Sequence, residues 1–124
     1  TVPGQTETML AGVPWTTPMF QSHAYHVSKA PPGATVLAKS ATPPDECFKA
    51  GIRTYGFQFH FEFDRPGITR HFAITKKTMD VDWMDLEQLE GQLDAHNARF
   101  ARACDRLCLN VASFAVPFDR RLAV

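Results

Sequence analysis

A strict alternation near the middle of the chain limits its folding more than any other feature. Phenylalanines and polar residues take turns over eight positions: Phe57, Gln58, Phe59, His60, Phe61, Glu62, Phe63 and Asp64. Successive side chains of a β-strand point to opposite faces, so a period of two predicts a strand whose phenylalanines share one face. We expect this strand to span residues 52–63 and to pair with residues 46–49 in a hairpin that turns at Ala50-Gly51.

The remaining elements are predicted from turn residues and helical spacing. Residues 1–16 are expected to form a loop with at most one helical turn, and residues 19–23 and 35–40 two short strands. Asp64 and Pro66 are typical of a helix start, and that helix should reach about Thr75. From about Asp80 to Pro117 an apolar stripe predicts one long amphipathic helix, or two broken near Gly91: Leu86, Leu89, Leu93, Phe100, Ala103, Leu107, Val111 and Phe114.

Composition excludes several function classes. The chain has 124 residues, is 44% hydrophobic and carries 13 basic and 13 acidic side chains, so its formal net charge is zero. Without a basic surface, neither nucleic acid nor an anionic membrane is an expected partner. The chain shows no signal peptide and no long apolar run, and its three cysteines are read as reduced thiols; we therefore expect a cytoplasmic protein.

The alternation also places two chemically useful side chains together. His60 and Glu62 lie on the same face of the predicted strand, with α-carbons about 6.5 to 7 Å apart. A carboxylate bound to one ring nitrogen fixes the histidine tautomer and stabilises the imidazolium, which leaves the other nitrogen to exchange a proton with a nucleophile. The pair therefore forms two thirds of a possible catalytic triad.

The order of motifs resembles that of the class I glutamine amidotransferases, most closely the stand-alone, GMP-synthase-like members. The resemblance covers about residues 13–72 and rests on three segments, which are Ser22-His23 with Val27, the Pro32-Gly33-Ala34 turn and the stretch from Gly56 to Glu62. It implies an α/β chain forming the C-terminal portion of a doubly wound, flavodoxin-like domain. It further implies that His60 is the general base, that Glu62 orients it, and that Ser22 and His23 line the glutamine side of the pocket.

The family's nucleophile is a cysteine on a glycine-flanked strand-to-helix turn, and this sequence contains no such motif. Cys47 follows acidic residues that would raise its pKa, and Cys104 and Cys108 fall within the long predicted helix. The resemblance thus implies the later half of a domain, with residues 1–78 as that half and 79–124 as its helical extension. A chain lacking the central parallel strands would expose apolar sheet faces, so we expect self-association or marginal stability.

The function that follows from the resemblance is hydrolysis of the glutamine side-chain amide. The expected partners are glutamine and a synthase domain or subunit that accepts the ammonia; no cofactor or metal is expected. Two alternatives stay open. The chain could be an inactive binding module that docks through its long helix, or His23, His26, His60 and Glu62 could ligate a metal.

Overall fold

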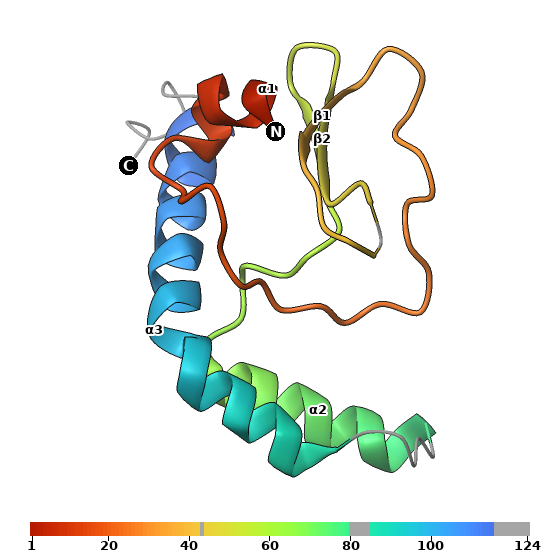
Figure 1. The fold of residues 1–124 in the computed structure, drawn as a ribbon, viewed down its shortest axis with the longest axis vertical. Coiled ribbons are helices and arrows are strands. Elements are labelled where there is room, and N and C mark those ends of the chain that lie inside the picture. The colour runs from red at the N-terminus through yellow and green to blue at the C-terminus, as the bar shows by residue number, and fades with distance from the viewer. Residues whose placement is uncertain (43, 80–84, 116–124) are drawn as a thin grey trace, which may run out of the picture.

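A computed structural model describes residues 1–42, 44–79 and 85–115. Its main elements are two long helices and a small antiparallel sheet (Figure 1). The helix α2 spans Arg65–Met79 and lies alongside the beginning of α3, Leu86–Asn110. The sheet lies beside the later part of α3, next to the short helices α1, Val2–Thr6, and η1, Thr8–Leu10. The chain thus mixes helices with a sheet, as the general α/β class requires.

The sheet has three strands in the order β1-β2-β3, each antiparallel to the next. Their bounds are Thr35–Ala38, Cys47–Ala50 and Thr54–Phe57. The hairpin predicted between β2 and β3 is confirmed, and its turn includes Gly51 at φ 63°, a left-handed conformation that suits glycine. All strand pairs among the described residues are antiparallel, so a doubly wound parallel sheet does not follow from this part of the chain.

The predicted strand over residues 52–63 is too long, because β3 ends at Phe57. One further backbone bond joins Gln58 N to Glu46 O at 2.8 Å, just before the start of β2 at Cys47, and the ladder does not continue beyond it. The following segment instead pairs with the predicted strand over residues 19–23, which forms only an isolated bridge between Phe20 and His60. There the His60 N–H donates to the Phe20 carbonyl at 2.9 Å.

One predicted helix start is confirmed and one predicted helix end is corrected. The Asp64 carboxylate accepts from Gly67 N at 2.8 Å at the start of α2, but α2 continues past Thr75 to Met79. The helix α3 runs through Gly91 without a break, and a π-helical turn, η2, follows it over Val111–Ala115. The predicted helix start at Asp80 and its end at Pro117 lie outside the described residues.

The N-terminal segment contains more helix than the single turn expected of it, with α1 packed against β1 and η1 packed against α3. Gly4 is required there, because a Cβ at this position would collide with the carbonyl oxygen of Leu37 in β1. None of the helices in the described ranges combines the length with the apolar character that crossing a bilayer demands.

The apolar core consists of two clusters that meet at the segment after β3. The first lies between the sheet and α3 and is centred on Leu37, Cys47, Phe59 and Leu107. The second lies between α2 and α3 and is centred on Ile68, Leu93, Phe100 and Cys104. Phe61 packs against both clusters, so the residues on either side of it are held where the two halves of the core join.

Candidate functional site

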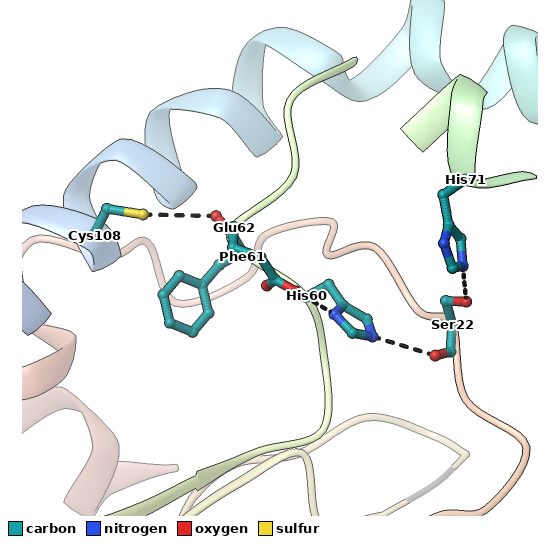
Figure 2. Close-up of polar contacts among 6 residues, drawn as sticks. All are labelled: Ser22, His60, Phe61, Glu62, His71 and Cys108. Carbon is teal, nitrogen blue, oxygen red and sulfur yellow. Dashed lines mark hydrogen bonds and ion pairs between the residues drawn. The ribbon is translucent and has the colours of Figure 1, made fainter. Parts of the chain in front are cut away.

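His60 and Glu62 make the contact that the alternation predicts. The His60 Nδ1 atom lies 2.6 Å from the Glu62 Oε1 atom (Figure 2). The two residues follow the end of β3 and are separated by Phe61, whose ring packs against the core. The His60 side chain is 32% exposed and that of Glu62 57%, so the pair lies at the surface with the ring the more protected partner.

The charge state of Glu62 follows from its surroundings. Partial burial raises the pKa of Glu62, but the hydrogen bond from His60, the backbone N–H groups and the positive charge of a protonated ring together outweigh it. The net result is a pKa below the ordinary value for a glutamic acid. Glu62 is therefore a carboxylate at neutral pH, the form that can orient an imidazole.

The second ring nitrogen of His60 also faces an acceptor. Its Nε2 atom lies 3.2 Å from the backbone carbonyl oxygen of Ser22. A carboxylate and a carbonyl can each only accept, so both contacts are hydrogen bonds at once when both ring nitrogens carry hydrogen.

Ser22 connects this pair to α2 through its side chain. The Ser22 Oγ atom lies 2.6 Å from Nε2 of His71, a residue of α2, so one serine contacts both histidines, by its carbonyl and by its hydroxyl (Figure 2). Sequence reasoning did not assign His71 to the site. The one signal that could have suggested it is spacing, since His71 follows the buried Ile68 by three residues on the same helix.

Two phenylalanines surround the histidine rings. Phe20 lies 6.0 Å from the His60 ring and 6.0 Å from the His71 ring, measured between ring centroids. Phe63 lies 5.5 Å from His60 and 5.4 Å from His71. Phe20 and Phe63 also contact each other edge to face at 5.7 Å. These rings restrict the orientations of both imidazoles and shield one side of the site from water.

His23 does not join the site, although Ser22 does. Its side chain is exposed, and its Nε2 atom contacts the Gln21 side-chain oxygen at 3.0 Å. His26 is also exposed. Within the described ranges there is no group of three or more His, Cys, Asp or Glu residues that could hold a metal ion, so the four ligands of the metal hypothesis are not gathered.

The three cysteines, all described, are free thiols, and two of them lie in environments that raise their pKa. Burial, with a smaller contribution from the Glu7 charge, raises the pKa of Cys47 to about 12. Burial is also the main cause that raises the pKa of Cys104 to about 12. Cys108 is exposed, and its thiol points to the carbonyl oxygen of Phe61 at 3.8 Å, away from the His60 ring (Figure 2).

Comparison with known proteins adds no relative: neither a family model, nor a curated protein, nor a solved structure matches this chain. The site is therefore interpreted from its own geometry and from the motif order of the sequence.

Proposed function

We propose that this chain carries the general base and the orienting carboxylate of a class I glutamine amidotransferase, with His60 as base and Glu62 as the residue that orients it. The proposal also makes the small sheet one part of a larger, doubly wound domain in a cytoplasmic protein. The observation that carries it is the continuous contact from Glu62 through His60 to Ser22. Two motif segments that are 38 residues apart in the sequence meet at the ring that would do the chemistry.

The environments of the thiols support a nucleophile supplied from elsewhere in the protein. A nucleophilic cysteine acts as its thiolate, and a pKa of about 12 leaves Cys47 and Cys104 protonated at neutral pH. Cys108 is accessible, but it lies on a helix and contacts the Phe61 carbonyl instead of an imidazole. In the family that the sequence resembles, the cysteine precedes the Ser-His motif, and we propose the same order for the complete protein.

The proposed reaction assigns one task to each residue. The cysteine thiolate attacks the side-chain carbonyl carbon of glutamine, and His60 protonates the nitrogen as the carbon–nitrogen bond breaks and ammonia leaves. His60 then removes a proton from water, whose oxygen attacks the thioester, so that glutamate is released and the thiolate is restored. Glu62 keeps the ring in place and stabilises its positive charge. Ser22 holds the far side of the ring, while the ammonia passes to an acceptor domain or subunit.

The test is a His60→Asn substitution in the gene product that also contains the upstream cysteine segment. Loss of a general acid–base group should lower the glutaminase rate by about 10²- to 10⁴-fold. The exposed His26 provides the matched control, and His26→Asn should leave the rate unchanged. Retention of full activity by the His60→Asn protein would refute the assignment.

The alternative function, an inactive binding module, predicts that the gene does not encode the nucleophilic cysteine upstream of this chain. If the natural coding sequence contains no Gly-x-Cys-x-Gly turn after an apolar strand, the chain cannot complete the proposed triad, and the long helix α3 becomes the natural candidate for contacting a partner. Sequencing the upstream region of the gene distinguishes the two functions before any assay is made.

A further inference from the structure

A cavity is lined by residues other than those of the histidine pair. This cavity of about 460 Å³ opens between η1, the segment that follows it, β1 and the later part of α3. Its lining includes neither His60, Glu62 nor Ser22. Phe59 contributes to its wall, whereas the neighbouring His60 does not. This difference is expected because successive side chains of an extended chain point in opposite directions. The cavity is thus separate from the proposed catalytic site.

The walls of this cavity are mainly apolar. Leu37 and Phe59 form part of the wall and are themselves buried, so they belong to the fixed core instead of a mobile surface. Leu10, Val13 and Met19 complete this apolar lining. The volume falls in the range of about 300 to 1,000 Å³ that is typical of small-molecule sites.

A buried acidic side chain, Glu46, lies in this lining. Glu46 is only 4% exposed, and its two carboxylate oxygens each accept one hydrogen bond from a neutral donor. Ser40 Oγ donates to Oε1 at 2.7 Å, and Gln21 Nε2 donates to Oε2 at 2.9 Å. Each oxygen keeps a second lone pair. Among the described residues no cationic side chain forms an ion pair with Glu46, although Lys39 lines the same cavity.

A buried hydroxyl supplies an independent sign of a missing ligand. The Thr17 Oγ1 atom is buried and has no hydrogen-bond partner in the part of the chain that the structure describes, and Thr17 lines the same cavity. Buried polar atoms in folded proteins are nearly always paired, because an unmade hydrogen bond costs about 1 to 3 kcal/mol. As far as the described residues go, the cavity therefore contains both a buried carboxylate with no ion-pair partner and a buried hydroxyl with no hydrogen-bond partner.

We propose that this cavity binds a small amine, a ligand with an apolar ring or chain that ends in an ammonium group. The ammonium donates to the free lone pairs of Glu46, and the apolar part packs against Leu37 and Phe59. An ammonium at Glu46 supplies the counter-charge that a buried carboxylate otherwise lacks. The Thr17 hydroxyl can form a hydrogen bond with a polar atom elsewhere on the ligand.

Two probes of nearly equal shape test the proposal on the 124-residue chain. Tryptamine carries an ammonium, and indole-3-ethanol has the same ring and linker with a hydroxyl in its place. Isothermal titration should show tryptamine binding at least tenfold more tightly than indole-3-ethanol. Amide NMR spectra should place the shift changes at Thr17, Leu37 and Phe59, and leave His60 and Glu62 unaffected. Failure of tryptamine to bind, or equal affinity of the two probes, overturns the proposal.

Two variants test whether Glu46 causes the preference for tryptamine over indole-3-ethanol. Glu46→Gln should reduce the preference for tryptamine to near parity, while Glu87→Gln, in the exposed first turn of α3, should leave it unchanged. Circular dichroism checks that each variant is folded. If Glu46→Gln does not fold, the comparison of the two probes on the unmodified chain still decides the question. A folded Glu46→Gln chain that keeps the full preference contradicts the assignment.

Discussion

The hydroxyl of Ser22 and the Nε2 atom of His71 lie 2.6 Å apart, although 49 residues separate them in the sequence. This contact fastens the loop that carries Ser22 to α2, and the carbonyl of the same serine faces His60. His71 is accordingly a positioning residue in the proposed site, since it acts on His60 through Ser22.

His71→Phe should keep the packing against Phe20 and Phe63 but remove the bond to Ser22. We expect a loss of about 1 kcal/mol in the free energy of unfolding, the usual effect of one side-chain hydrogen bond. We also expect a change in the imidazole NMR signals of His60, which a purely local packing role for His71 would not produce. His96→Phe, at an exposed position of α3, is the control. Unchanged His60 signals would contradict the positioning role.

The lowered pKa of Glu62 predicts how this residue affects stability as the pH changes. A carboxyl whose pKa is lower in the folded chain stabilises that chain at pH values above the unfolded pKa, about 4.3. This contribution is lost as the pH falls through the lower folded value. Because Glu62 is mostly exposed to solvent, the contribution should stay below about 1 kcal/mol.

Urea unfolding of the unmodified chain and of the Glu62→Gln variant should therefore show a small difference in the free energy of unfolding at neutral pH. This difference should disappear in acid. Addition of salt should reduce the difference at neutral pH, since exposed charges are screened. A difference that grows on acidification has the opposite sign and would show that Glu62 does not keep a lowered pKa.

The cysteines should differ sharply in reactivity. At neutral pH a thiol-specific reagent should modify Cys108 quickly, because this thiol is exposed. Cys47 and Cys104 should react only after the chain unfolds, since both are buried and each has a pKa of about 12. Mass spectrometry of a time course identifies the modified residue, and Cys108→Ser should remove the fast phase. Rapid labelling of Cys104 in the folded chain would contradict the described packing of α3.

Exposed apolar side chains bear on the expected association of the isolated chain. Several large ones lie at the surface, with exposed fractions of 80% for Trp15, 89% for Tyr25 and 85% for Ile52. If the sheet belongs to a larger domain, this chain should associate as its concentration rises, and sedimentation velocity would detect the larger species. A monodisperse monomer that melts cooperatively would count against the half-domain interpretation.

Local patterns predicted the parts of the molecule that depend on neighbouring residues. Alternation placed His60 beside Glu62, the Ala50-Gly51 pair marked the hairpin, and Asp64 marked the start of α2. The predicted strand was too long because its ladder depends on a partner, and β2 begins at Cys47, which pairs with Phe57. The alternation of phenylalanines and polar residues continues to Asp64, but β3 does not.

Contacts between distant segments were not predictable in the same way. No periodicity links Ser22 to His71, and the cavity at Glu46 is formed by segments that are far apart in the sequence. Gly91 was a plausible break because glycine costs a helix about 1 kcal/mol. The packing of Leu93 and Phe100 against Ile68 outweighs this cost, and α3 continues through it.

Phe61 gives the proposed site an unusual dependence on the rest of the fold. Its ring contacts both core clusters, and its carbonyl receives the Cys108 thiol of α3, while His60 and Glu62 are its immediate neighbours in the chain. A displacement of α3 relative to the sheet must therefore disturb the alignment of acid and base. Alignment of the pair and formation of the two-part core are then a single cooperative event, so a distance probe between His60 and Glu62 would serve as a sensor of global folding.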